Sequence, residues 1–514
     1  METYPDIEVR FGRTQQKEEE LTKEARNIYD YLVSKKELKL NTGDLIFYII
    51  DNNSLASQAA FSVYGFDSWM LGQQYLIDKS MLDKGMLDIF EMVDRSKRFE
   101  LEGKEYIIAF LNRRNELPEN ISTISHVFGH AHVMRNNYLS KDNEVSLDKL
   151  LDLRQSMEEL EKKIGVREVE KIIEIGDTLG SLQDYYPDLH KDKDIKYTDS
   201  IPERDTYDIA HFVIENARMP QWKKEAVRNV LSFYQSHINS RIKVIHESFS
   251  TFVQYNAIGY YSLNPGIATK LLQFLNMVAS PAYLFTSLIG EGAAQIPYSL
   301  YNLFERMYKE NQISVYSVVA GMDDVTFLRN YLSKEFVIEL LEGIIKNPPK
   351  LYSIIEQMEA KSLPTSEDAV NEVVLKIILS KLLGWDDEKT NNSSLDGLIY
   401  NIRQHYDDYS FYRNFKDPIM LLLVESTPPI LYIPTGGYSN DYLRVIQYLP
   451  LSRYLDEDNY TEDELKKIIA SFTINNQRTL NTFKLVSSLL GNKPIKLRTF
   501  DPKDGSEKEI EVKA

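Results

Sequence analysis

Apolar residues recur every three to four positions along much of the chain, which is the spacing of amphipathic helices. Leu21, Ala25, Ile28 and Leu32 follow this period among charged residues, so the pattern predicts a helix within 15–40. The same period predicts further helices at 84–97, 120–138, 146–164, 166–185, 205–217 and 221–260, and a helical region at 322–346.

Short apolar runs predict strands near both ends of the chain. In the N-terminal part they lie at 44–50 and 106–111. In the last hundred residues they lie at 418–425, 430–434, 441–448, 493–500 and 508–512, with helices expected at 462–470 and 478–490. We therefore expect an α+β fold: a mainly α-helical body, a small mixed segment at its N-terminal end, and a C-terminal α+β domain.

This order of elements suggests a division into two regions. Residues 1–320 are expected to form a mainly helical domain that carries the candidate metal site. Residues 321–514 are expected to form a C-terminal region with a helical insertion at 347–392 and a small α+β domain at about 415–514.

Composition narrows the chemistry. The 514 residues carry a net charge of −17, and an acidic surface repels the phosphate backbone, so we do not expect nucleic acid as a partner. The chain has no cysteine, which excludes disulfides, thiolate metal sites and cysteine nucleophiles. A transition metal must therefore be bound by histidine and carboxylate side chains.

One segment raises the question of a membrane. Residues 271–290 contain no charge, but they include Gln273, Asn276 and Pro281, which favours a buried or partly exposed pair of helices joined at the proline over a membrane span. The first residues lack the basic start and apolar run of a secretory signal. We therefore expect a cytoplasmic protein without membrane attachment.

The histidines are concentrated, since seven of the eight lie between His126 and His246. His126 and His130 are four residues apart in a predicted helix, so both imidazoles lie on one stripe, together with Asn137. This is the spacing by which one helix offers two nitrogens to a zinc ion. His132 lies off the stripe. The alternative is a pair of hydrogen-bonded core histidines.

A carboxylate with a neighbouring histidine forms the second candidate element. His246 and Glu247 lie in an apolar helical stretch, where a buried carboxylate is costly unless it is paired or bound to a metal. The alternative is an ion pair between Lys243 and Glu247 on a solvated helix face. Further candidates for the surroundings of the site, each equally compatible with an unrelated ion-pair network, are Tyr234, His211 and Glu215.

The segment from His126 to Asn137 resembles the His-Val-x-x-His-x-Asp-Phe-Phe-Lys-Asn-Asn motif of the SpoVR-like family, named for stage V sporulation protein R. Residues 243–250 resemble its Lys-Ile-Met-Asn-Glu-Gly-Trp-Ala segment, although His132, His246 and Phe249 depart from the pattern and indicate a divergent member. The resemblance implies a cytoplasmic protein linked to sporulation, but no substrate. Further segments that resemble the family lie at 61–93, 263–265, 327–332 and 490–495.

A weaker likeness suggests a mechanism. The family segment is similar to the Asn-Glu-Gly-Phe-Ala segment of gluzincin aminopeptidases, whose glutamate is the third zinc ligand. By this resemblance His126, His130 and Glu247 form a site for zinc or another divalent transition metal, while Val127 stands where gluzincins have their catalytic glutamate. The candidates for another base are His246, His132 and Glu215.

Two functions follow from these residues. The first is a zinc-dependent hydrolase of amide or peptide bonds. The alternative is a non-catalytic scaffold or regulatory protein in which the same residues form a structural metal site or a hydrogen-bonded histidine cluster.

Overall fold

The structure, a computed structural model, describes most residues of the chain. These are residues 5–10, 15–50, 91–96, 106–113, 115–140, 147–186, 205–232, 241–287, 296–346, 367–386, 388–389, 392–425, 429–474 and 477–514.

A four-stranded sheet forms the N-terminal part, in the strand order β1-β2-β4-β3. β1, β2 and β4 are parallel, and β3 runs antiparallel to β4. The helix α1 (Gln15–Ser34) follows β1 and packs against it. The expected strands at 44–50 and 106–111 are thus confirmed. The strands are β1 (Ile7–Arg10), β2 (Asp44–Ile50), β3 (Glu91–Ser96) and β4 (Tyr106–Asn112).

The helix expected at 84–97 is wrong where the structure describes it. Residues 91–96 form β3 and pair along their whole length with β4. Residues 84–90 and 97 lie outside the described residues. Helical spacing within the segment could not reveal that a buried strand is available as a partner, and such tertiary context overrides local preference.

The N-terminal sheet lies between two hydrophobic cores. In β4, Ile107, Ala109 and Leu111 belong to the first core, whereas the alternate residues Ile108 and Phe110 belong to the second. A strand that is buried on both faces reads as a continuous apolar run, which is why β2 and β4 show no polar alternation.

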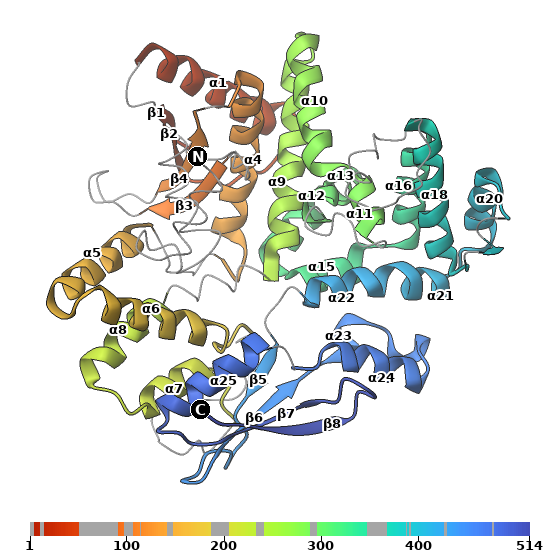
Figure 1. Ribbon diagram of the computed structural model, residues 1–514. Helices are drawn as coiled ribbons and strands as arrows, with labels where there is room; N and C mark the ends of the chain where they lie inside the picture. The colour runs from red at the N-terminus through yellow and green to blue at the C-terminus, as the bar shows by residue number, and fades with distance from the viewer. Residues whose placement is uncertain are drawn as a thin grey trace.

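The first core lies within a body of helices, whose centre is the pair α4 and α9 (Figure 1). α4 is buried around its whole circumference from Asn120 to Val133. The helices of this body are α4 (Leu117–Asn136), α9 (Lys243–Ala257), α10 (Pro265–Ala279), α11 (Ala282–Thr286), α12 (Ile296–Ser299), α13 (Tyr301–Glu310), α14 (Gln312–Gly321), α15 (Asp324–Tyr331), α16 (Lys334–Lys346), α18 (Glu367–Leu383), α20 (Leu395–His405), α21 (Asp408–Phe411) and α22 (Asp417–Glu425).

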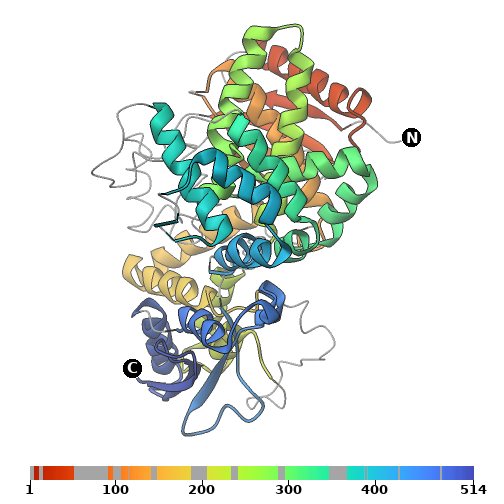
Figure 2. The ribbon, with the colours of Figure 1, turned by 90° about the vertical axis from the view of Figure 1, so that its right-hand side faces the viewer.

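The second core joins two stretches that are far apart in sequence. Helices from residues 147–231 pack with a C-terminal sheet of strand order β5-β6-β7-β8, and Figure 2 shows this part below the helical body. The elements are α5 (Leu147–Ile164), α6 (Val166–Gly180), α7 (Ile209–Asn216), α8 (Gln221–Leu231), β5 (Ile430–Tyr432), β6 (Leu443–Tyr448), α23 (Leu451–Tyr454), α24 (Glu462–Ser471), α25 (Gln477–Leu489), β7 (Ile495–Phe500) and β8 (Glu507–Val512). The expected mainly helical α+β fold is confirmed, while the domain division remains a prediction.

Two expected elements near the boundaries of these cores are wrong. Residues 418–425 form the helix α22 and not a strand, because an unbroken apolar run does not distinguish the two and Pro418 suits the first turn of a helix. The single helix expected at 221–260 is not continuous. α8 ends at Leu231 and α9 begins at Lys243, and residues 233–240 lie outside the described residues.

The uncharged segment 271–290 belongs to two short helices as far as it is described. α10 ends at Ala279 and α11 begins at Ala282, with Pro281 at the joint, as expected. Among the placed helices, none has both the length and the apolar character needed to cross a bilayer.

α4 and α9 approach each other closely at one glycine. A Cβ added to Gly129 would lie 2.3 Å from Ser250 Cα and 2.9 Å from Ser250 Cβ, distances that require the helix backbones to separate. The hydrogen atom of Gly129 thus sets the distance between the helix that carries His126 and the helix that carries Glu247.

The start of α9 is fixed by a carboxylate from another helix. Asp324, the first residue of α15, accepts hydrogen bonds from Val244 N at 2.8 Å and Ile245 N at 2.9 Å. These backbone N–H groups lie in the first turn of α9, where no intrahelical acceptor exists for them. Asp324 therefore caps α9 three residues before Glu247.

The neighbouring Asp323 joins this helix start to α23 and, through Arg241, to Tyr185 and Tyr186. Its carboxylate pairs with Arg241 at 3.0 Å and with Arg453 of α23. Arg241 also donates to the carbonyl oxygen of Tyr185 and lies over the ring of Tyr186. The two parts seen in Figure 2 are thus connected by a buried charged cluster immediately before α9.

We expect Gly129→Ala to lower stability. Alanine usually stabilises a helix relative to glycine by about 0.5–1 kcal/mol, but overpacking a core contact costs about 1–3 kcal/mol. Chemical denaturation measures the difference. Gly343→Ala in α16 is the matched control, because no atom lies within 4 Å of its added Cβ, and it should be neutral or stabilising. Equal effects of the two substitutions would contradict a close α4–α9 contact.

We expect Asp324→Asn to loosen the first turn of α9. The amide can accept only one of the two N–H bonds and turns a donor toward the other, which costs about 1–3 kcal/mol. Hydrogen exchange at the Val244 and Ile245 amides should become faster. Asp407→Asn, at the exposed cap of α21, is the control and should change stability by less than about 0.5 kcal/mol, because asparagine caps equally well. Unchanged exchange in Asp324→Asn would show that Asp324 does not cap α9.

Candidate functional site

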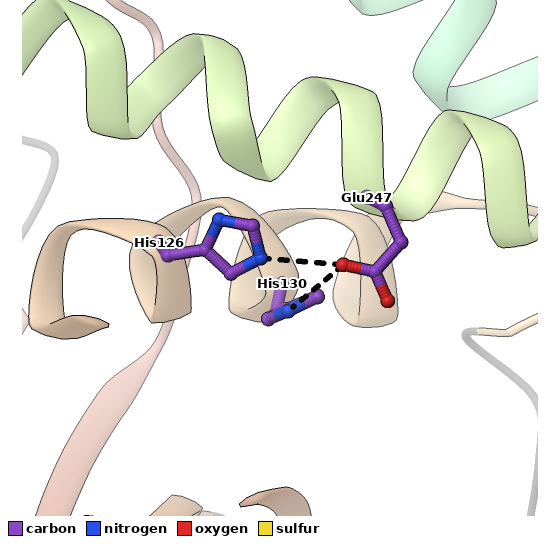
Figure 3. A group of neighbouring side chains, drawn as sticks. All are labelled: His126, His130 and Glu247. Carbon is purple, nitrogen blue, oxygen red and sulfur yellow. Dashed lines mark hydrogen bonds and ion pairs between the residues drawn. The ribbon is translucent and has the colours of Figure 1, made fainter. Parts of the chain in front are cut away.

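Two histidines of α4 and one glutamate of α9 form a compact cluster, drawn in Figure 3. His126 and His130 lie one turn apart on the face of α4 that packs against α9, as their spacing predicted. Both are buried, with 8 % of each side chain exposed, and their rings meet edge to face with centroids 4.5 Å apart.

Glu247 points from α9 to both imidazoles. Its Oε2 lies 3.2 Å from His126 Nε2 and 3.7 Å from His130 Nε2, while Figure 3 shows the other carboxylate oxygen turned away. The three side chains offer donor atoms that all lie within 4.8 Å of one another. The predicted triad is therefore brought together by the packing of α4 on α9.

The charge of Glu247 depends on these histidines. Burial alone raises the pKa of the carboxyl group, but the charges of His130 and His126 and the hydrogen bond to His126 outweigh burial and hold the pKa at about 2. Since only 16 % of the side chain is exposed, the carboxylate takes its stabilisation from the imidazoles and not from water.

A polar pair behind His126 extends the cluster. His126 Nδ1 lies 3.0 Å from Oε1 of Gln254, and Gln254 Nε2 donates to Ser122 Oγ at 2.5 Å. Gln254 and Ser122 are buried and come from α9 and α4, respectively. The sequence offers no sign that Gln254 belongs to the site, because its partner Ser122 lies 132 residues away along the chain.

His246 lies beside the cluster. Its ring centroid is 4.3 Å from that of His130, and its Nε2 lies 3.4 Å from the carbonyl oxygen of His130. Burial, reinforced by the charge of His130, lowers the pKa of His246 to about 3. The imidazole is therefore neutral near pH 7 and is the predicted base that lies nearest to the three donor atoms.

An aromatic side chain borders the same cluster. The ring of Tyr298 in α12 stacks on His126 with centroids 6.2 Å apart and an angle of 22° between the planes. Tyr298 is partly exposed. This contact could not be predicted from local pattern, because α12 is a four-residue helix that contacts α9 only in the folded chain.

The structure turns His132 away from the site. Its Nδ1 accepts a hydrogen bond from Asn41 N at 2.9 Å, and its ring packs against Phe249 and Tyr316. Burial lowers its pKa to about 4, so it is a neutral core histidine. This position agrees with its predicted place off the stripe and gives no support to its candidate role as a base.

Asn137 likewise serves the fold. Its side chain donates to the carbonyl oxygens of Val319 at 2.7 Å and Met322 at 3.0 Å, and accepts from Leu139 N. These bonds fasten the end of α4 to the end of α14. Asn137 therefore does not face the metal-binding candidates, because α4 ends at Asn136 and the stripe ends with it.

The remaining candidates do not join the cluster. Glu215 and His211 lie on α7, which Figure 1 shows beside the C-terminal sheet, and the Glu215 carboxylate pairs with Arg228 of α8 at 2.5 Å. Lys243 is exposed at the start of α9, while Glu247 faces the histidines, so the alternative of a solvated Lys243–Glu247 face finds no support. Tyr234 lies outside the described residues.

Comparison with known proteins agrees with part of this picture. Residues 15–196 match the family model described as SpoVR like protein. No curated protein and no solved structure matches the chain. The matched stretch contains α4 with both histidines of the cluster, whereas Glu247 and Gln254 lie beyond it.

The resemblance seen in the sequence is thus confirmed over the matched residues, while the likeness of the later segments remains a prediction. On the strength of this match, residues 15–196 are similar to the family described as SpoVR like protein.

Proposed function

We propose that the chain is a zinc-dependent hydrolase of amide or peptide bonds, with His126, His130 and Glu247 as the metal ligands. The observation that carries the proposal is the convergence of two imidazole nitrogens and one carboxylate oxygen within 4.8 Å in a buried setting. Two histidines and one carboxylate are the ligand set of catalytic zinc sites that keep a position for water.

The charges of the site support a cation. A carboxylate that is largely buried is stable only beside a positive charge, and in the metal-free chain a second proton on a neighbouring imidazole has to supply that charge. A divalent ion between the three donors supplies this charge without any further proton. The residues present therefore fit the metal that the resemblance implies.

Each side chain has a defined part in such a site. Zinc, when bound, acts as a Lewis acid and lowers the pKa of a bound water. Glu247 of α9 would hold the ion with a negatively charged oxygen, and His126 and His130 of α4 would hold it with one nitrogen each. His246 is neutral and adjacent to His130, so it is the described side chain best placed to accept a proton. Tyr298 lies over His126 and is partly exposed, where it can contact a substrate.

A second candidate function is a structural or regulatory metal site without catalysis. The observation that favours it is Val127, a fully buried apolar residue at the position of the gluzincin catalytic glutamate. The low pKa of His246 also makes it a weak base. Both functions use the same three ligands, so metal binding is tested first and catalysis second.

We expect the purified chain to bind one zinc ion. Elemental analysis after incubation with zinc and gel filtration should give one equivalent in the wild type and near none in His126→Ala or Glu247→Gln. His132→Ala is the matched control, because it removes a buried histidine of the same helix that faces away from the cluster. It should retain the zinc, even if stability falls. No zinc in the wild type, or equal zinc in all variants, would exclude the site.

We expect hydrolysis to depend on that ion. A library of internally quenched peptides should be cleaved by the zinc-loaded chain, not after chelation, and again after one equivalent of zinc is restored. Glu247→Gln should lose at least about 100-fold of the rate, because losing a ligand removes transition-state stabilisation of several kcal/mol. A loaded chain that cleaves no member of the library would favour the structural or regulatory function.

A further inference from the structure

We infer that Gln254, held by Ser122, fixes the tautomer of His126 with its proton on Nδ1, so that Nε2 offers a lone pair to a metal ion beside Glu247. Gln254 is thus a positioning residue for the metal ligand. The role in metal binding rests on the proposed function, whereas the position of the proton does not.

The direction of the hydrogen bonds leads to this assignment. Gln254 Nε2 donates to Ser122 Oγ at 2.5 Å, which leaves Oε1 of the same amide facing His126 Nδ1 at 3.0 Å. A carbonyl oxygen can only accept a hydrogen bond. The hydrogen must therefore be on Nδ1.

The other nitrogen of the ring follows from the first. A neutral imidazole carries one proton, so a proton on Nδ1 leaves Nε2 with a lone pair. That nitrogen is the one that lies 3.2 Å from Glu247 Oε2. Two acceptors at this distance repel each other unless a positive charge lies between them. In the metal-free chain a second proton on Nε2 can provide it as the hydrogen bond to Glu247, and a metal ion can take the place of that proton.

The pair is placed to hold this arrangement rigidly. Ser122 lies one turn before His126 on α4, and Gln254 lies two turns after Glu247 on α9, so the hydrogen-bonded chain crosses the same interface as the metal ligands. Both residues are 4 % exposed. Hydrogen bonds are stronger where water is excluded, and partners that fix the tautomer of a ligating histidine typically contribute 10–100-fold in metal affinity.

The proton position can be measured without any metal. Nitrogen-15 NMR of the metal-free chain, labelled in histidine and assigned with His126→Ala, reports whether each ring nitrogen carries a proton. We expect a protonated Nδ1 in His126. A His126 with an unprotonated Nδ1 would overturn the inference, because Gln254 would then donate to it and not accept from it.

Zinc affinity of Gln254 variants tests the consequence. Gln254→Leu removes the acceptor and should weaken zinc binding about 10–100-fold. Gln254→Glu should bind zinc at least as tightly as the wild type, since a carboxylate only accepts and the Ser122 hydroxyl can turn to donate to it. A leucine variant with wild-type affinity, or a glutamate variant as weak as the leucine variant, would show that Gln254 only fills space.

A second buried glutamine provides the control. Gln447 of β6 accepts from Thr499 and donates to the carbonyl oxygen of Phe472 in the second core. Gln447→Leu should lower stability without changing zinc affinity. If the wild type shows the Nδ1 proton but binds no zinc, the proposed function fails and the tautomer assignment stands. If the wild type binds zinc but His126 lacks the Nδ1 proton, the proposed metal site stands and the tautomer assignment fails.

Discussion

The packing of α4 against α9 is the contact on which the rest of this structure depends. Because Gly129 has no side chain, Ser250 of α9 occupies the space that a Cβ at position 129 would need. The two helices are therefore close enough for His126 and His130 of α4 to meet Glu247 of α9. Because α4 is buried around its circumference, the sheet, α1 and α10 hold it from its other sides. A small change in this one distance would move Glu247 relative to both histidines, so the site is as rigid as the core that contains it.

The polar residues of α4 fall into two groups, those that hold the helix in place and those that face the metal-binding candidate Glu247. Asn137 and His132 bind backbone groups of neighbouring elements and fasten α4, whereas His126 and His130 face a carboxylate. On α9, the capping by Asp324 fixes the start of the helix, and the Asp323 cluster ties that start to α23 in the other part of the molecule. The cluster is thus supported at both ends of α9, by Asp324 before Glu247 and by Gln254 after it.

Many of the helices and strands, and the shared face of the two histidines, could be predicted from local sequence pattern. Features that depend on a partner far away in the sequence could not. The four-residue spacing of His126 and His130 was enough to predict that both imidazoles lie on one face, because helix geometry is local, whereas Glu247 was joined to them only through the resemblance to gluzincins. Sequence reasoning failed where a distant partner decides. β3 forms because β4 is beside it, α22 is a helix although its apolar run allowed a strand, and Glu215 is carried to the second core by α7. The roles of Gln254 and Asp324 depend on partners about 80–130 residues away in sequence, which no periodicity encodes.

X-ray absorption spectroscopy at the zinc edge of the loaded chain is the most direct test of the central claim, because multiple scattering from imidazole rings counts the histidine ligands. The account predicts two imidazole nitrogens together with oxygen ligands, at the distances of about 2.0–2.2 Å that zinc prefers. A spectrum with no imidazole, or with three or more, would contradict a site formed by His126, His130 and Glu247.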